Sequence, residues 1–450
     1  MNCELRKVVF GMVMAFACVI DVRADAVVAT VPTEEYAGSI AIDSITNKIY
    51  VSDEFYQANG IPTYMVTVIN GATDSTTNVS VSNAIKLMAV NPATDKIYAV
   101  NYANYVTIIN GANNDTATVS VVSDPMADPV AIVVNPVTNK IYVANESGGF
   151  VTVINGANND TATVGTDFQP VAIAVNQLTN KIYVVNGEGN NVFVIDGATN
   201  DIATVSVGSS PLAIAVNPVT NKIYVANNGS SNVTVINGVT NDTATVSVGP
   251  DPYPGTGPGP NAIVANPVTN KIYVANLNSN NVVVIDGATN GTTTVSVGSS
   301  PLAIAVNPVT NKIYVANSGS NSVTVIDGAN NGATTVGAGT YPCAIALNSI
   351  TNKIYVLNSE SSNVTVIDGT LTTAVRSVPS QPKTSCVIGY SGILAVYSLN
   401  GRQIMKLPFA ASATKESVLG SVGKIPATGV YKYCFLRDRK VMDEGSFLVR

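Results

Sequence analysis

One short string recurs through this sequence and limits what the chain can fold into. TNKIYV, or a close variant of it, occurs eight times, with its lysine at Lys48, Lys96, Lys140, Lys181, Lys222, Lys271, Lys312 and Lys353. Successive copies are 48, 44, 41, 41, 49, 41 and 41 residues apart. A period of about 40 residues built from short strands is typical of β-propellers, in which each repeat forms one four-stranded blade. We therefore predict an all-β, eight-bladed β-propeller, with seven blades as the alternative if one terminal unit stays outside the ring.

The unit that starts at Pro211 shows the parts of one predicted blade. PLAIAVN, KIYVAN, NVTVING and TATVSVG predict four strands, which we call a, b, c and d. Turn residues separate them: Asn217-Pro218 follows strand a, and Asn237-Gly238 ends strand c. Strands a to c are apolar on both faces, whereas strand d alternates Thr and Ser with Ala and Val. The pattern predicts that strand order runs from the propeller axis outward.

The lysine and tyrosine of each TNKIYV copy are interpreted as structural residues. Eight near-identical copies would otherwise imply eight separate functional sites in one chain. We expect the tyrosine to pack between blades with its hydroxyl hydrogen-bonded to a partner, and the lysine to extend to solvent from the strand start.

The two ends of the propeller predict how the ring closes. Residues 26–32, AVVATVP, resemble a strand d with no a, b and c before them. Paired with NVTVIDG of the last unit, this segment would supply the missing outer strand and remove two exposed edges. The competing segment for the same position is TTAVRSV, residues 372–378. We favour the N-terminal segment.

The amino-acid sequence of the repeat resembles that of a known family. NKIYVAN, followed by NVTVIDGATN and TVSVG, is similar to the YVTN family of β-propeller repeats of microbial surface-layer and other cell-surface proteins. The resemblance covers eight copies over about 350 residues. It implies the propeller fold and an extracellular setting, and it provides no catalytic residues to transfer.

The first 24 residues predict a cleaved secretory signal. A basic start, a short apolar core and small residues at Ala24 and Ala26 are typical of such signals, with cleavage after either alanine. The alternative is a retained membrane anchor, but about 13 apolar residues fall short of the roughly 20 needed to span a bilayer. We expect a secreted or cell-surface protein with no membrane-spanning segment in the mature chain.

A second region begins near residue 376. The predicted propeller is residues 25–376. From Asp25 to Val375 the chain carries 9 lysines, 23 acids and no arginine, a net charge of −14, whereas the chain from Arg376 onward has +7. After a linker at 377–385, residues 386–450 contain VYSLNGR, TGVYKYCF and a final FLVR. This succession resembles the C-terminal sorting domain of the type IX secretion system. The resemblance implies an Ig-like β-sandwich that engages the secretion machinery. The alternative is an accessory β-domain that is specific to this protein and unrelated to secretion.

The cysteines do not form a disulfide framework. Cys343, Cys386 and Cys434 remain after signal cleavage. Cys386 and Cys434 can pair inside the C-terminal region or stay free, and Cys343 is expected to be a small buried hydrophobe.

The composition excludes most catalytic chemistry. The chain has no histidine, which removes Ser-His and Cys-His pairs and histidine-ligated metals. The chain has no arginine between Arg23 and Arg376, which argues against sialidase-type chemistry and against nucleic-acid binding by the propeller. Residues 206–227 and 296–317 are identical, whereas an active site needs asymmetry. We expect no enzyme, cofactor or metal, with a carboxylate-dependent polysaccharide lyase or hydrolase as the alternative.

The loops predict which face binds. Because successive strands are antiparallel, the b–c and d–a loops emerge on one side of the disc and the a–b and c–d loops on the other. Insertions at residues 53–64 and 250–260 both belong to the first set. So do most aromatic residues outside the repeat, of which the candidate ligand-binding residues are Phe55, Tyr56, Tyr102, Tyr105, Phe150, Phe168, Tyr253 and Tyr341. The alternative is that these rings fill loop gaps or line the channel.

These observations favour a binding or adhesion scaffold whose ligand is an extracellular carbohydrate or protein. A structural surface-layer component is a further alternative.

Overall fold

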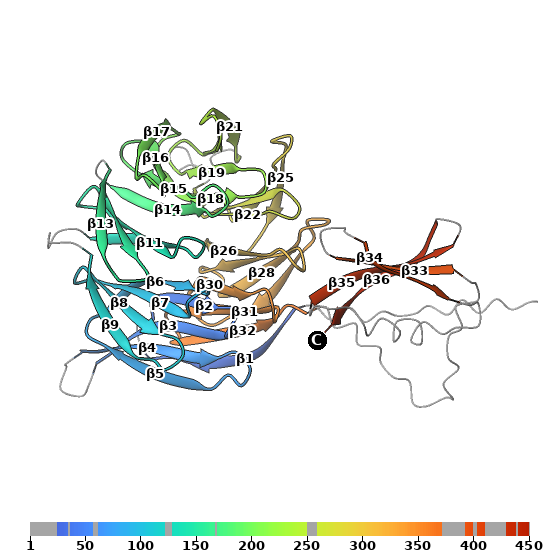
Figure 1. Ribbon diagram of the computed structural model, residues 1–450, viewed down its shortest axis with the longest axis horizontal. Coiled ribbons are helices and arrows are strands. Elements are labelled where there is room, and N and C mark those ends of the chain that lie inside the picture. The colour runs from blue at the N-terminus through green and yellow to red at the C-terminus, as the bar shows by residue number, and fades with distance from the viewer. Residues whose placement is uncertain are drawn as a thin grey trace, which may run out of the picture. The chain divides into compact units, whose positions relative to one another are not determined.

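The computed structural model describes residues 25–34, 37–56, 62–121, 128–166, 169–249 and 259–370, and the backbone of four C-terminal strands. The chain divides into two compact units, Val22–Ala374 and a second that includes Val375–Arg450. The larger unit contains eight four-stranded antiparallel sheets arranged around a ring (Figure 1). The prediction of an eight-bladed propeller is confirmed, and the seven-bladed alternative is wrong.

Each blade contains one strand of each kind, and blades 1 to 8 are numbered in the chain order of their a strands. The a strands are β2 (Ser39–Asp43), β6 (Ile85–Asn91), β10 (Pro129–Asn135), β14 (Pro170–Asn176), β18 (Pro211–Asn217), β22 (Pro260–Asn266), β26 (Pro301–Asn307) and β30 (Pro342–Asn348). The b strands are β3 (Lys48–Tyr56), β7 (Lys96–Asn101), β11 (Lys140–Asn145), β15 (Lys181–Asn186), β19 (Lys222–Asn227), β23 (Lys271–Asn276), β27 (Lys312–Asn317) and β31 (Lys353–Asn358). The c strands are β4 (Pro62–Asn70), β8 (Tyr105–Asn110), β12 (Phe150–Asn155), β16 (Asn191–Asp196), β20 (Asn232–Asn237), β24 (Asn281–Asp286), β28 (Ser322–Asp327) and β32 (Asn363–Asp368). The d strands are β5 (Thr76–Val81), β9 (Thr116–Ser120), β13 (Thr161–Gly165), β17 (Ile202–Ser206), β21 (Thr243–Ser247), β25 (Thr292–Ser296), β29 (Ala333–Gly337) and, for the last blade, β1 (Ala26–Pro32).

Burial follows the predicted order from the axis outward. The a strands of neighbouring blades contact one another, the b and c strands are almost completely buried, and the d strands expose most of their residues. The core consists of clusters between adjacent blades. At one seam, Tyr224 and Val235 of blade 5 pack with Ile272 and Val274 of blade 6. Each blade therefore depends on its neighbours to bury both of its faces.

The turns explain why the repeat contains Asn and Gly at fixed positions. Asn221, at the end of the a–b turn, has φ of 51°, a left-handed conformation that Asn adopts more readily than most residues. Its backbone carbonyl accepts the N–H of Gly238 at 2.8 Å. A Cβ on Gly238 would lie 2.3 Å from the Asn221 Oδ1, so only glycine fits against this turn.

The repeat lysines connect neighbouring blades. Lys181 Nζ donates to the carbonyl of Gly238 at 2.8 Å, and Lys271 Nζ donates to that of Gly328 at 2.7 Å. In both cases the acceptor belongs to the c–d turn of the next blade. The expectation that the repeat lysines extend to solvent is wrong, because the next blade presents a carbonyl within reach of seven of the eight ammonium groups.

The repeat tyrosines pack between blades as expected, but their hydroxyls lack the predicted partner. All eight are fully buried, and none of their hydroxyls is hydrogen-bonded. The Tyr355 hydroxyl instead lies against Gly71, a c–d turn glycine of the next blade in the ring. Burial raises the pKa of Tyr142 to about 12, and the Asp196 carboxylate adds to the rise.

Asparagine side chains form a second connection between blades. The last residue of strand a donates through Nδ2 to the Oδ1 of the last a–b turn residue in the next blade, as from Asn176 to Asn221 at 2.8 Å. Seven of the eight seams carry this bond, between 2.8 and 2.9 Å. The a–b turns are therefore neighbours all round the ring.

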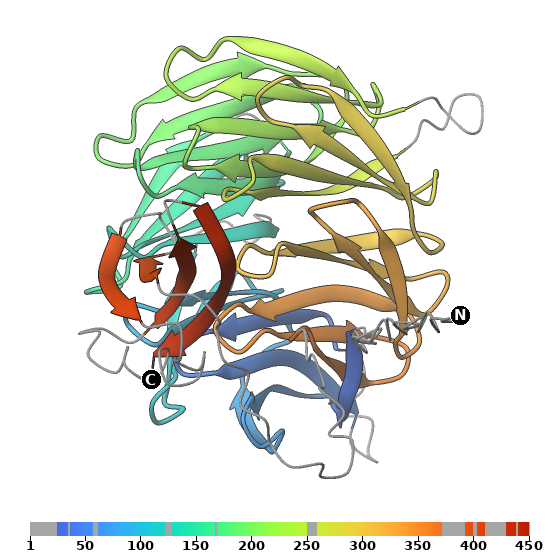
Figure 2. The same ribbon diagram turned by 90° about the vertical axis from the view of Figure 1, so that its right-hand side faces the viewer.

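The N-terminal strand closes the propeller, as predicted. β1 pairs antiparallel with β32, so the last sheet has the order β1-β32-β31-β30. Figure 2 shows the blue N-terminal strand beside the orange strands of the last blade. Asp25, next to β1, forms an ion pair with Lys312 of blade 7 at 2.7 Å, and both side chains are buried. At this seam a carboxylate replaces the carbonyl acceptor that the other repeat lysines use.

The second unit contains β33 (Gly392–Ser398), β34 (Gln403–Phe409), β35 (Gly429–Arg437) and β36 (Lys440–Val449). They form one antiparallel sheet with the order β34-β33-β35-β36. The predicted β-strands are therefore present, and the Ig-like sandwich stays a prediction. The signal segment, the linker, Cys386 and residues 372–378 lie outside the described residues.

Candidate functional site

The face formed by the b–c and d–a loops carries two pockets. One lies across blades 6, 7 and 8, and the other lies at the seam of blades 1 and 2. Their lining residues come from b–c turns, d–a turns and the adjoining strand ends. We call this side of the disc the b–c face and the opposite side the a–b face.

The predicted aromatic residues do not form one cluster. Tyr102 lines the pocket at blades 1 and 2, and Tyr341 lines the pocket at blades 6 to 8. Tyr105 is 42% exposed at the start of β8, and the partly buried Phe150 ring packs over Gly148. Phe168, Tyr253 and the side chains of Phe55 and Tyr56 lie outside the described residues.

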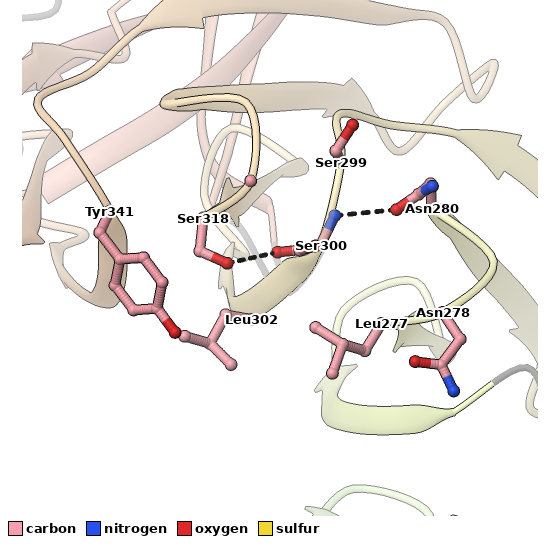
Figure 3. Close-up of a pocket in the computed structure, with 9 residues that line it drawn as sticks. Leu277, Asn278, Asn280, Ser299, Ser300, Leu302, Ser318 and Tyr341 are labelled. Atoms are coloured by element: carbon pink, nitrogen blue, oxygen red, sulfur yellow. Dashed lines mark hydrogen bonds between the residues drawn. The ribbon is translucent and has the colours of Figure 1, made fainter. Parts of the chain in front are cut away.

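The larger pocket has a volume of about 580 Å³ and no charged residue in its lining. Its wall combines one ring and two leucines with amides and hydroxyls, from Leu277, Asn278, Asn280, Ser299, Ser300, Leu302, Ser318, Gly319 and Tyr341. In Figure 3 the Tyr341 hydroxyl points toward Leu302, and Leu277 lies across from Leu302. This volume falls within the roughly 300–1,000 Å³ of small-molecule sites.

Tyr341 is held in an unfavourable backbone conformation. Its φ is 56°, in the left-handed region where a bulky residue costs about 1 kcal/mol or more. Its N–H donates to Asn321 Oδ1 at 3.0 Å, and its carbonyl accepts the N–H of Ser359 at 3.1 Å. The equivalent residues Asp128, Gln169, Ser210, Gly259 and Ser300 also have positive φ, so the repeat imposes this conformation. Among them Tyr341 is the one aromatic residue, and its 41% exposure makes it a candidate for binding.

The repeat provides an internal comparison for this pocket. Its Ser299, Ser300 and Leu302 fall in the stretch that is identical to residues 206–227 of blade 5. The two sites differ in their neighbours, because the residues equivalent to Leu277 and Tyr341 are both glycine around blade 5. The larger pocket is therefore distinguished by two apolar side chains contributed from blades 6 and 8.

The smaller pocket, about 240 Å³, contains a buried carboxyl group. Asp53 is 4% exposed, and neither of its side-chain oxygens accepts a hydrogen bond of ordinary geometry. Burial raises the pKa of Asp53 to about 7, and the Glu34 carboxylate adds to the rise. Contacts with the Thr67 side chain and the Glu34 backbone lower this pKa only in part.

Lys86 and Tyr102 form the outer wall of the smaller pocket. The Lys86 Nζ lies 5.6 Å from the centre of the Tyr102 ring, within cation–π range, and pairs with Asp128 at 2.6 Å. Lys86 is the one lysine of the propeller outside the repeat string, and Asp53 replaces an asparagine of the other seven blades. Aligning the repeats with each other would have singled out both residues, which the search for aromatic residues missed.

Blade 1 departs from the repeat a second time. At its seam with blade 2, Asp43 and Asp95 occupy the positions that hold the Asn–Asn bond at the other seams. The Asp43 Oδ2 and the Asp95 Oδ1 are buried without hydrogen bonds. Burial raises the pKa of Asp95, the facing Asp43 adds to the rise, and Lys48 opposes it. The seam therefore favours a protonated carboxyl group.

Replacing Asp43 with Asn should restore the repeat arrangement at this seam. The new Nδ2 would donate to Asp95, and the Oδ1 would keep accepting the Ile45 N–H, which is 2.8 Å from the Asp43 Oδ1. We expect Asp43→Asn to stabilise the protein by about 1–2 kcal/mol at pH 7. Because the folded-state pKa of Asp95 is raised, the stability that this group contributes is present at low pH and lost as the pH rises. Urea unfolding at pH 4 and pH 7 measures this effect, and an equal gain at both values would contradict it.

The a–b face carries a different feature, a ring of exposed aliphatic side chains. They stand at the tips of seven a–b turns and are from 50% to 75% exposed: Ile45, Val137, Leu178, Val219, Val268, Val309 and Ile350. Asparagine bonds join neighbouring a–b turns at seven of the eight seams, and the turn of blade 2 carries the small Ala93 instead of a large aliphatic tip. Such an apolar surface is a candidate for contact with another protein. The sequence analysis considered only aromatic loop residues and missed these aliphatic tips.

Among the described residues no group of three or more Asp, Glu or Cys side chains is placed to hold a metal ion. Nor does this part of the chain contain a helix long and apolar enough to cross a bilayer.

Comparison with known proteins identifies the fold alone. No protein-family model and no curated protein matches the chain. Saccharomyces cerevisiae Sqt1 is similar in structure, with a TM-score of 0.62 and 8% identity over 77% of this chain and 100% of Sqt1. A chain of a Mitotic Checkpoint Complex gives a TM-score of 0.53 and 12% identity over 82% of this chain and 99% of that one. The protein is thus an eight-bladed β-propeller with a separate C-terminal β-sheet unit.

Proposed function

We propose that this protein is a secreted or cell-surface binding scaffold of the YVTN-repeat type, which binds its ligand on the b–c face. One observation carries the proposal: both pockets and the exposed Tyr102, Tyr105 and Tyr341 belong to this face. Export would use the N-terminal signal, and residues 386–450 would serve the type IX secretion machinery. The ligand is an extracellular carbohydrate or protein, and the chain is not an enzyme.

The test compares the two faces. The triple variant Tyr102→Ala, Tyr105→Ala and Tyr341→Ala removes exposed rings from the b–c face. A matched triple, Val137→Ser, Val219→Ser and Val268→Ser, removes exposed side chains from the a–b face. Labelled protein is applied to a glycan array and to the surfaces of neighbouring microbial or host cells. We expect the aromatic triple to lower binding at least tenfold and the valine triple to leave it unchanged. The reverse result would place the binding site on the a–b face.

A structural surface-layer role is the second candidate function, and the aliphatic ring of the a–b face favours it. Seven exposed apolar tips around one ring suit contact with another copy or another component of a layer. Ordered self-assembly of the purified protein, abolished by the valine triple, would support this role. A polysaccharide-cleaving activity abolished by a single Asp or Glu substitution would instead support the lyase or hydrolase alternative.

A further inference from the structure

We infer that the pocket across blades 6, 7 and 8 is a subsite for one or two units of a neutral saccharide. This inference rests on the proposed function and names the ligand class of one site on the b–c face. The chemistry of the lining, the fixed position of Tyr341 and the differences from blade 5 support it.

The lining matches the two kinds of surface that a pyranose ring presents. The C–H face of a sugar ring is apolar and stacks on an aromatic ring, and Tyr341 supplies such a ring, with Leu277 and Leu302 beside it. The sugar hydroxyls at the ring edge need fixed donors and acceptors, which the serine and asparagine side chains supply. Since none of the nine lining residues is charged, a carboxylated, sulfated or phosphorylated sugar would find no cation there.

The polar groups of the pocket are held in place before any ligand binds. Asn280 Oδ1 accepts the N–H of Ser300 at 2.8 Å, which orients the Asn280 amide and leaves its Nδ2 to donate. The Ser318 hydroxyl donates to the Ser300 carbonyl at 3.0 Å, which leaves the oxygen lone pairs to accept (Figure 3). Fixed donors and acceptors lower the entropy lost on binding, which suits a weakly binding neutral ligand.

The aromatic platform is fixed as well. The hydrogen bonds of the Tyr341 backbone to Asn321 and Ser359, and the proline that follows it, set the direction of the ring. Blade 5 carries the same Ser209, Ser210 and Leu212 but faces glycines where the larger pocket has Leu277 and Tyr341. Two polar positions differ as well, since Glu188 and Asn228 stand where the larger pocket has Asn278 and Ser318. The site at blade 5 therefore shares the two serines and the leucine but lacks both the stacking surface and the uncharged lining.

The experiment uses the full chain with a panel of two- to four-unit oligosaccharides. Neutral glucose, mannose and galactose oligomers are compared with sialylated and sulfated ones by ligand-observed NMR and titration calorimetry. We expect at least one neutral oligomer to bind, and the charged ones to bind at least tenfold more weakly. Tyr341→Ala should weaken binding at least tenfold, and Tyr341→Phe less than threefold. Leu302→Ala should weaken it several-fold, whereas its matched control Leu212→Ala should have no effect.

A stability measurement separates a binding role from a packing role. Tyr341→Gly relieves the left-handed backbone, so we expect it to raise the unfolding temperature by about 1–3 °C while it abolishes saccharide binding. A lower unfolding temperature would show that the Tyr341 side chain stabilises the fold by packing, and it would overturn the inference.

The remaining outcomes separate this inference from the proposed function. Binding of a neutral saccharide that all these variants leave unchanged overturns the pocket assignment. If no saccharide of the panel binds but Tyr341→Ala abolishes binding to cell surfaces, the pocket takes a different class of ligand, which overturns the inference and leaves the b–c face as the binding surface. If only the valine triple on the a–b face affects binding, both proposals fail.

Discussion

Asp53→Asn is expected to stabilise the protein by about 4 kcal/mol at pH 8, and most of this gain should disappear at pH 4. The pKa of Asp53 rises from 3.8 to about 7 on folding, because the carboxyl group is buried. Each pKa unit is worth about 1.4 kcal/mol, so this rise lowers the free energy of unfolding by about 4 kcal/mol once the group is ionised. Asparagine at this position carries no charge and avoids that cost.

The sign of the pH dependence follows from the direction of the shift. Because the folded-state pKa lies above the unfolded-state value, folding favours the neutral carboxyl group. The stability that this group contributes is complete below pH 3.8 and is lost as the pH rises to about 7. The natural chain should therefore lose stability between these values, and Asp53→Asn should lose much less.

The repeat indicates that asparagine fits this position. At the equivalent place in blade 5, Asn227 Nδ2 donates to Thr234 Oγ1 at 2.9 Å, and Thr67 occupies the corresponding place in blade 1. Urea unfolding at pH 4, 6 and 8 measures the gain. Asp242→Asn, at an exposed turn, is the matched control and should change stability by less than about 0.5 kcal/mol at each pH. A natural chain whose stability does not fall between pH 4 and 8 would contradict the buried-carboxyl interpretation.

The strands were predictable because the same pattern of strand and turn residues recurs in each of the eight repeats. In blade 5 the predicted strands correspond closely to β18, β19, β20 and β21. Asn-Pro and Asn-Gly turns end these strands in the sequence, and the alternation of strand d marks it as the exposed edge. The orientation of the loops followed from antiparallel connectivity alone.

Contacts between blades were not predictable in the same way. The sequence places Lys181 at a strand start, but its partner is the Gly238 carbonyl, 57 residues away in the next blade. Likewise Tyr341 was singled out as an aromatic loop residue, whereas Leu277 and Leu302 were not. The larger pocket is lined by side chains from three consecutive blades. The pattern within one repeat does not show which side chains of neighbouring blades will lie together. Departures from the repeat, such as Asp53 and Asp43, are the signal that sequence comparison within the chain can supply.

The closing strand should be the most sensitive part of the propeller. Val31 of β1 is 3% exposed and packs with Val364 and Val366 of the last blade and with Ile49 of the first. Val31→Asp removes this apolar contact and places a carboxylate among aliphatic side chains. We expect a loss of about 4 kcal/mol or more, a large part of the roughly 5–15 kcal/mol that stabilises a domain.

Val28 provides the matched control because it lies on the same strand and is 52% exposed. Val28→Asp should change the free energy of unfolding by less than about 0.5 kcal/mol. A peptide of residues 25–32 added to the Val31→Asp protein should restore part of the lost stability, since it can pair with β32 through its main chain and bring Asp25 to Lys312. Thermal unfolding with and without the peptide measures both effects. If Val31→Asp is as stable as Val28→Asp, the ring does not depend on β1, and residues 372–378 become the segment to examine as an alternative outer strand.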